Sequence, residues 1–280
     1  MNDAVLPYLR CPNCSSALTA TGGYPGPRGL RCVRGHSFDI AKQGYATLLA
    51  GPYRHAGDSA EMVADRAAFL AAGYFRFVAQ GLADAATAEA RAARSGPPLL
   101  LDAGTGTGYY LSAVLDAVPH AIGLGLDVSK PALRRAARAH PRASAALADL
   151  WRPLPLADAS ATLILDVFSP RNGPEFHRVL RPGGALLVIT PAADHLAELV
   201  GAYGLLRVDP DKAGRVGGSL GGRFAVASTR TLRREMRLDA TSVRTLIGMT
   251  PSARHVPPDA LTTESRTVTA AVDLTVYRPV

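Results

Sequence analysis

Residues 99–110, LLLDAGTGTGYY, constrain the fold of this chain more than any other stretch. They join a short apolar run to Asp102 and then to three glycines at alternate positions, Gly104, Gly106 and Gly108. An apolar run that ends in a turn is typical of a buried parallel strand, and glycines let the backbone bend sharply and let a ligand approach closely. The stretch therefore predicts a strand, a glycine-rich loop and a helix in a doubly wound α/β domain.

The acids around this loop indicate the ligand. A dinucleotide site has the spacing G-x-G-x-x-G, whereas here the spacing is G-x-G-x-G and Asp102 would repel a pyrophosphate. A carboxylate there suits a cationic amino group. Asp127 ends the next apolar run, where an acid can accept hydrogen bonds from both ribose hydroxyls. S-adenosyl-L-methionine fits both acids, and the pattern resembles the first two motifs of class I methyltransferases; a tight turn without a ligand is the simpler alternative.

Strands and helices alternate after this loop. We expect strands at 99–101, 122–127, 143–148, 162–167 and 185–190, the last preceded by a turn at 181–184. We expect helices at 110–118, 129–139, 173–180, 192–206 and 241–249, and antiparallel strands at 225–234 and 267–277. Because ligands of open α/β sheets lie beyond the carboxyl ends of the strands, Asp102, Asp127 and Asp149 should share one edge. There Asp149 could bind the adenine amino group.

The cysteines and one histidine are clustered near the N-terminus. Cys11 and Cys14 are separated by two residues, and Cys32 and His36 by three. Two such pairs form a tetrahedral Cys3His zinc site with no open position, so the Zn2+ is expected to be structural. A module this small lacks a core of its own and would depend on the metal. Three buried thiols without a metal are the alternative.

Composition narrows the class of protein. The chain has 280 residues, 48% of them hydrophobic, which is enough for a sizeable core. No apolar run reaches the roughly 18 residues that suggest a membrane span, and no signal peptide is evident, so we expect a cytoplasmic protein without membrane contact. The net charge of +8 favours a polyanionic partner, although excess charge also serves solubility alone.

We expect three regions: a zinc-binding module at 1–50, a helical connector at 51–97, and a methyltransferase domain at 98–280. In the connector, Ser59 can cap a helix that ends near residue 72, and a second helix follows at 74–93. The oligomeric state is left open, with a homodimer among the options.

Taken together, these segments resemble the RlmA family of 23S rRNA guanine-N1-methyltransferases, and within it the macrolide-resistance branch. The resemblance covers nearly the whole chain. Its segments include CPNC with C-x3-H, SFDIAKQGYATLL, GDSAEM, LDAGTGTGYY, GLDVSK, VLRPGG, TPAADHLAEL and MTPSAR. The methyltransferase motifs alone are generic, but their combination with the zinc module, AKQGY and GDSAEM is specific.

The resemblance implies a class I methyltransferase fold, S-adenosyl-L-methionine as cofactor, and 23S rRNA bound in part by the zinc module. It implies that Gly106 and Thr107 contact the cofactor and that His195 reaches it. Phe75 takes the place of a tyrosine found beside the cofactor in relatives. The segment 168–171 takes the place of the loop that receives the target base.

The expected reaction is methyl transfer to N1 of a guanine in an rRNA hairpin loop. N1 is protonated at neutral pH, so a base is needed; Asp166 is considered, but it could equally cap a turn, and no catalytic residue is assigned. For phosphate contacts we consider Arg54, Arg66, Arg171 and Arg215. The alternatives are a methyltransferase for a small molecule, and a zinc-dependent RNA-binding or ribosome-assembly protein with a vestigial cofactor site.

Overall fold

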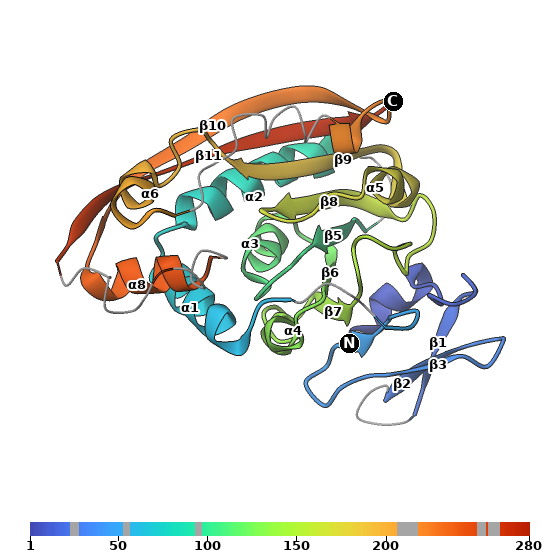
Figure 1. The fold of residues 1–280 in the computed structure, drawn as a ribbon. Coiled ribbons are helices and arrows are strands. Elements are labelled where there is room, and N and C mark those ends of the chain that lie inside the picture. Colours follow the sequence, from blue (N-terminus) through green and yellow to red (C-terminus); the bar gives the residue numbers. More distant parts are fainter. Residues whose placement is uncertain (23–27, 53–56, 93–96, 206–217, 251–255, 257–263) are drawn as a thin grey trace.

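The structure is a computed structural model that describes residues 1–22, 28–52, 57–92, 97–205, 218–250, 256 and 264–280. Its main feature is an eight-stranded sheet (Figure 1). In chain order, the strands of this sheet are β4 (Ala46–Thr47), β5 (Leu99–Ala103), β6 (Ile122–Asp127), β7 (Ala143–Leu147), β8 (Ala161–Val167), β9 (Leu180–Pro191), β10 (Phe224–Leu238) and β11 (Arg266–Pro279). Their spatial order is β10-β11-β9-β8-β5-β6-β7-β4.

The order of the strands confirms the predicted doubly wound arrangement. The chain starts the parallel region in the middle, at β5, moves outward through β6 and β7, and then returns to the other side of β5 with β8 and β9. β11 is antiparallel to β9, and β10 is antiparallel to β11. The chain therefore winds first to one side of β5 and then to the other. Ligands of open α/β sheets bind in the crevice that forms at such a change in winding direction.

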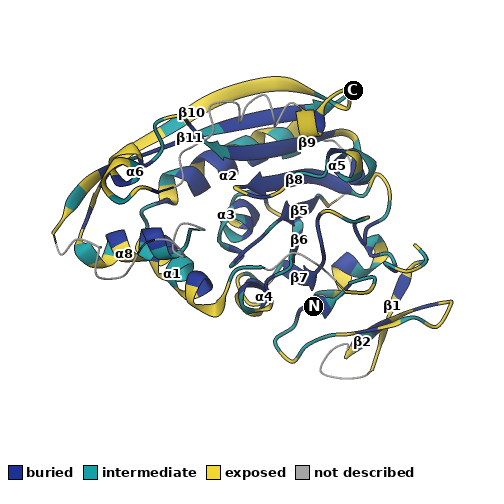
Figure 2. Cartoon of the chain, viewed as in Figure 1, coloured by how far each residue is buried: buried dark blue, intermediate teal, exposed yellow. Residues whose placement is uncertain are grey.

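Helices cover both faces of the sheet. They are α1 (Ala60–Ala71), α2 (Arg76–Ala92), α3 (Tyr109–Ala117), α4 (Lys130–Ala136), α5 (Gly173–Val179), α6 (Ala197–Tyr203) and α8 (Ala240–Gly248). One hydrophobic cluster joins α2 and α3 to one face, with Leu82, Leu115 and Leu163 among its buried members. The central strands are buried along their length, whereas β10 is mostly exposed (Figure 2).

The N-terminal region covers part of the second face. It has a short helix, η1 (Asp3–Tyr8), and a three-stranded sheet of β1 (Leu18–Thr21), β2 (Gly29–Cys32) and β3 (Ser37–Asp39). Leu9, Leu30 and Phe38 belong to the same hydrophobic cluster as Leu124 of the large sheet and Phe176 of α5. β4 then pairs in parallel with β7 and becomes an edge of the large sheet. The N-terminal region is therefore packed against the sheet rather than tethered to it.

Two local expectations differ from the structure. The segment 181–184, expected to be a turn, lies inside β9, whose pairing with β8 is irregular between Ala161 and Leu163. The helix expected at 192–206 is shorter, because α6 begins only after Leu196, which has a φ of +56°. Within the described residues, no helix is long and apolar enough to cross a membrane.

Gly125 of β6 faces the glycine-rich loop, and replacing it should be costly. An added Cβ would lie 2.6 Å from Oγ1 of Thr105, so Gly125→Ala should lower the free energy of unfolding by about 1–3 kcal/mol. Chemical denaturation measures this. Gly201→Ala is the control, because nothing lies within 4 Å of its added Cβ in α6, and there alanine should be neutral or stabilising. Equal stability of Gly125→Ala and the wild type would contradict the described packing.

Candidate active site and metal centre

The glycine-rich loop is a tight turn tied to the neighbouring strand. The backbone N–H groups of Gly104 and Thr105 both donate to the carbonyl of Leu126, at 2.9 and 3.0 Å. Gly104, Gly106 and Gly108 have φ values of +75°, +55° and +80°, a region that side chains rarely adopt. The three glycines are therefore required by the backbone of the turn, and the loop is held at the carboxyl end of β5, where the sequence predicted it.

Asp102 is buried at the base of this loop. Its Oδ2 accepts a hydrogen bond of 2.6 Å from the hydroxyl of Thr105. Burial raises the pKa of Asp102 to about 7, and the negative charge of Asp127 adds to the effect, while the Thr105 hydroxyl opposes it. A carboxylate in this setting gains strongly from a cationic partner, because such a partner offsets the cost of ionisation.

Asp127 ends β6 on the other side of the loop. Its Oδ2 accepts from the N–H of Gly106 and its Oδ1 from the N–H of Ser129, both at 2.8 Å. Burial raises the pKa of this carboxyl group, and the two backbone N–H groups work against that rise. Each oxygen retains a lone pair, so the group can also accept hydrogen bonds from a pair of hydroxyls. Asp102 and Asp127 thus lie at the two sides of one glycine loop.

Asp149 follows β7 at the same edge. Its Oδ1 accepts from the N–H of Trp151 at 3.0 Å, and its Oδ2 lies 3.7 Å from Nε of Arg152. The side chain is buried and helps to shape its own loop. The structure therefore brings Asp149 to the edge predicted from the sequence, although part of its hydrogen-bonding capacity is used locally.

Three rings meet beyond the ends of β8 and β9. Phe75, between α1 and α2, lies with its ring centroid 6.4 Å from that of Phe168 and 6.2 Å from that of His195. The Phe168 and His195 centroids are 6.1 Å apart. Phe75 is buried, whereas Phe168 is 40% exposed and has a φ of +54°. An exposed aromatic residue in a strained conformation at a strand end is typical of a functional site.

Asp166, considered as a base from the sequence, is unsuited to that role. Its side chain is fully buried, and its Oδ1 lies 3.3 Å from Nε of Arg171, which is itself mostly buried. A base must reach the proton that it removes. Asp166 and Arg171 instead form an internal pair that supports the loop 168–171. In that loop, the Ser169 hydroxyl is buried against Gly104, and it has no hydrogen-bond partner in the described structure.

The GDSAEM segment packs over the cofactor loop, a feature that sequence reasoning missed. Asp58 forms an ion pair with Arg66 of α1, and the Asp58 carbonyl accepts from the Ser129 hydroxyl at 2.8 Å. Arg66 also donates to the carbonyl of Met249 at 2.9 Å and lies beside Gly106. The sequence marked GDSAEM as distinctive but could not show the contacts of Asp58 with Ser129 and of Arg66 with Met249, which join residues far apart along the chain.

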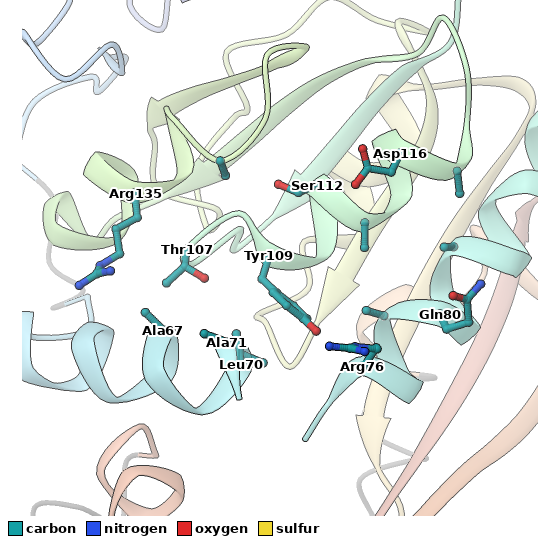
Figure 3. A pocket seen from close by; sticks show the side chains of 15 residues that line it. Ala67, Leu70, Ala71, Arg76, Gln80, Thr107, Tyr109, Ser112, Asp116 and Arg135 are labelled. Carbon is teal, nitrogen blue, oxygen red and sulfur yellow. The ribbon is translucent and has the colours of Figure 1, made fainter. Parts of the chain in front are cut away.

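A groove of about 750 Å³ opens beside the loop (Figure 3). It lies between α1 and α2 on one side and α3 and the end of α4 on the other, and many of its lining residues are alanines. Of the predicted cofactor residues, Thr107 lines it, together with Tyr109, Arg76 and Arg135. In Figure 3 the Tyr109 hydroxyl is directed toward Arg76. The groove therefore continues from the glycine loop onto the outer face of α3.

The predicted metal ligands come together. The ligand atoms of Cys11, Cys14, Cys32 and His36 all lie within 4.8 Å of one another. Sγ of Cys14 and Sγ of Cys32 are 3.7 Å apart, and Nδ1 of His36 is 3.5 Å from Sγ of Cys11 and 3.4 Å from Sγ of Cys32. Bonds of about 2.3 Å to sulfur and about 2.0 Å to nitrogen give tetrahedral edges of about 3.8 and 3.5 Å. The geometry therefore fits zinc.

Two tight turns hold these ligands. The N–H of Ser15 donates to the carbonyl of Cys11 at 2.8 Å, and the N–H of Gly35 donates to the carbonyl of Cys32 at 2.9 Å. Gly35 has a φ of +84°, and Ser15 has a φ of +57°. Both pairs of ligands are thus presented by backbone turns of the kind predicted from the spacing.

Metal analysis should find one zinc ion per chain. Because the module shares a hydrophobic cluster with the sheet, we expect Cys32→Ser to lose the metal and to lower the Tm of the whole chain by roughly 10 °C. Calorimetry measures this. Val33→Ser is the matched control in the same turn, since Val33 is 89% exposed. Full zinc content in Cys32→Ser would contradict the assignment of the ligands.

Comparisons with known proteins agree with the two parts of this site. Residues 9–55 match the family described as "RlmA, N-terminal", and residues 100–184 match the family described as "Methyltransferase domain". The first match contains all four predicted zinc ligands. The second contains the glycine loop, Asp102, Asp127 and Asp149.

Curated relatives match over the full chain. A putative 23S rRNA (guanine-N(1)-)-methyltransferase of Micromonospora griseorubida is 55% identical, with all of both chains covered. The 23S rRNA (guanine(748)-N(1))-methyltransferase of Streptomyces fradiae is 47% identical, covering 100% of this chain and 99% of its own. A putative 23S rRNA (guanine-N(1)-)-methyltransferase of Bacillus subtilis (strain 168) is 31% identical, covering 95% and 94%. This chain therefore belongs to the family of 23S rRNA (guanine-N1)-methyltransferases.

Proposed function

We propose that this chain transfers a methyl group from S-adenosyl-L-methionine to N1 of a guanine in a hairpin loop of 23S rRNA. The observation that carries the proposal is the pair of buried carboxylates, Asp102 and Asp127, on the two sides of one glycine loop in a member of this family. S-adenosyl-L-methionine has a cationic amino group at one end and a ribose in its middle, and the two acids suit these groups in turn.

The cofactor supplies, when bound, the electrophilic methyl group of its sulfonium. In our proposal Asp102 pairs with the cofactor's ammonium group, Asp127 accepts from the ribose hydroxyls, and Asp149 accepts from the adenine amino group. Gly104, Gly106 and Thr107 form the backbone surface beneath it. Phe75 lacks the hydroxyl of the tyrosine in relatives and supplies packing, while Nδ1 of His195 is occupied by the Ala271 backbone, with contacts of 2.8 Å to its carbonyl and 3.2 Å to its N–H.

The target guanine must be unpaired, because N1 lies on its Watson–Crick edge. We propose that it enters beside Phe168, whose exposed ring can stack on the base. The loop 168–171 then orients the base, and the internal Asp166–Arg171 pair keeps that loop in place. Much of the rate enhancement would come from this alignment of N1 with the methyl group. The residue that accepts the N1 proton is not assigned.

We also propose a role for each region of the chain and a place of action in the cell. Residues 1–50 serve as the RNA-recognition module, 51–97 as a helical connector, and 98–280 as the methyltransferase domain. The chain acts in the cytoplasm, where it meets rRNA, and the methyl group it adds protects the ribosome against macrolides such as tylosin. Sedimentation equilibrium tests whether the chain forms a homodimer.

Labelled methyl transfer to protein-free 23S rRNA tests the reaction. After digestion, we expect the label in 1-methylguanosine. Asp127→Ala should raise the KM for the cofactor by roughly 10- to 100-fold, since charge-assisted hydrogen bonds of about 1–3 kcal/mol are lost. Asp84→Ala, an exposed acid on α2, is the control and should behave as the wild type. Label in a small molecule but not in rRNA would contradict the proposal.

Cofactor binding should depend on pH through Asp102. Its pKa lies near 7 instead of 3.8, so the group is largely protonated at pH 5.5 and must ionise to pair with an ammonium. Affinity should rise roughly tenfold between about pH 5.5 and about pH 7, measured by calorimetry. Asp102→Asn should bind weakly and lose most of this dependence, keeping only the part due to Asp127. An unchanged pH dependence in Asp102→Asn would contradict the assigned role.

A further inference from the structure

Helix α4 and the turn that follows it present four cations and no acid. Lys130, Arg134, Arg135 and Arg138 are all exposed, and residues 128–139 contain neither Asp nor Glu. Within the part of the chain that the structure describes, none of the four side chains forms an ion pair. Lys130 and Arg134 are four residues apart and so share one side of the helix, and Arg138 lies in the turn directly after Ala136, the last residue of α4. We call these four residues the α4 basic face.

The stability of the helix does not explain this arrangement. Cations of like charge four residues apart repel each other on a helix surface. Lys130 is the first residue of α4, next to the cap Ser129, where the helix dipole also disfavours a positive charge. The dipole favours only Arg134 and Arg135 in the last turn. A negatively charged partner outside the chain would account for the whole set of cations.

Helix α4 lies between the cofactor edge of the sheet and the segment that leaves the zinc module. At its start, the N–H of Ser129 donates to Asp127, at the cofactor edge of the sheet. At its end, Ala137 lies against Gly44 of the segment that leaves the zinc module, with an added Gly44 Cβ 3.7 Å away. Figure 1 shows α4 between α1 and the N-terminal region. Its apolar side, with Leu133, packs against Tyr45 and Leu147, so the cations face outward from a fixed helix.

The arginines that the sequence singled out for phosphate contacts are less suitable. Arg66 is paired with Asp58, and Arg171 is paired with the buried Asp166. Arg54 and Arg215 lie outside the described residues. The cations of the α4 basic face, by contrast, are adjacent, and no acid among the described residues forms an ion pair with them. Arg135 extends the charge toward the groove beside Thr107 (Figure 3).

We propose that the α4 basic face binds the phosphate backbone of the rRNA substrate, between the zinc module and the cofactor site. This inference rests on the proposed function. Arginine matches phosphate geometry with two parallel hydrogen bonds, and lysine binds phosphate as a point charge. Lys130 and Arg134 are separated by about 6 Å along the helix axis, and Arg138 lies beyond the end of the helix, so the face can contact more than one phosphate. These contacts hold the RNA in place while the target base reaches Phe168.

The test compares two double variants of equal charge. Arg134→Gln with Arg138→Gln removes two cations from the α4 basic face. Arg234→Gln with Arg237→Gln removes two exposed cations from β10, at the opposite end of the sheet order. Binding of labelled 23S rRNA is measured at several salt concentrations, and methyl transfer is measured at saturating cofactor. Circular dichroism and cofactor binding establish that both variants are folded.

We expect the α4 variant to bind rRNA about tenfold more weakly and to reduce the slope of log affinity against log salt by about 1.5, as two lost phosphate contacts require. Its KM for rRNA should rise while kcat stays near the wild-type value, and the β10 variant should match the wild type. Equal losses in both variants, or no loss in the α4 variant, would overturn the proposal. Absence of methyl transfer by the wild type would instead contradict the proposed function, and the binding data would still test the α4 basic face.

Discussion

The site depends on a buried carboxylate that ends the first parallel strand. Asp102 is held by the Thr105 hydroxyl, and the N–H groups of Gly104 and Thr105 are held by the Leu126 carbonyl of the adjacent strand. Thr105 in turn fills the space that Gly125 leaves open. Because Thr105 takes part in most of these contacts, they together fix the conformation of the glycine loop. That shape holds Asp102 and Asp127 on the two sides of the loop, where we propose that they bind the cation and the ribose of the cofactor.

The N-terminal module is part of the hydrophobic core and of the large sheet. Its apolar residues continue the hydrophobic cluster of the second face of the sheet, and β4 extends the sheet by pairing with β7. A zinc ion that orders two turns therefore also supports the surface against which the catalytic domain packs. The same packing places the module at the end of α4 that lies away from Asp127. The module is thus joined to the large sheet by packing and strand pairing as well as by the chain itself.

Local sequence patterns predicted the central part of this structure well. The apolar runs that end at Asp102 and Asp127, the cap at Ser59, and the cysteine spacing each depend on neighbours close in the chain, and the structure has the corresponding elements where expected. Pairings between side chains were beyond such reasoning, whether the partners are near or far along the chain. Arg66 pairs with Asp58 and the Met249 carbonyl, and Arg171 pairs with Asp166. Two arginines considered for phosphate contacts and an acid considered as a base are therefore part of the internal structure. The absence of an ion pair at the α4 basic face likewise became evident only from the positions of the acids that the structure describes.

The central claim is that a cofactor held between Asp102 and Asp127 delivers its methyl group to an unpaired guanine of 23S rRNA. Mapping the modified nucleotide tests it most directly. Methylation at N1 blocks Watson–Crick pairing, so reverse transcription of rRNA from cells that express the chain should stop at the modified base. The account predicts one new stop, at a guanine in a hairpin loop, which is absent when Asp102→Asn is expressed instead. No new stop, or a stop within a paired helix, would contradict it.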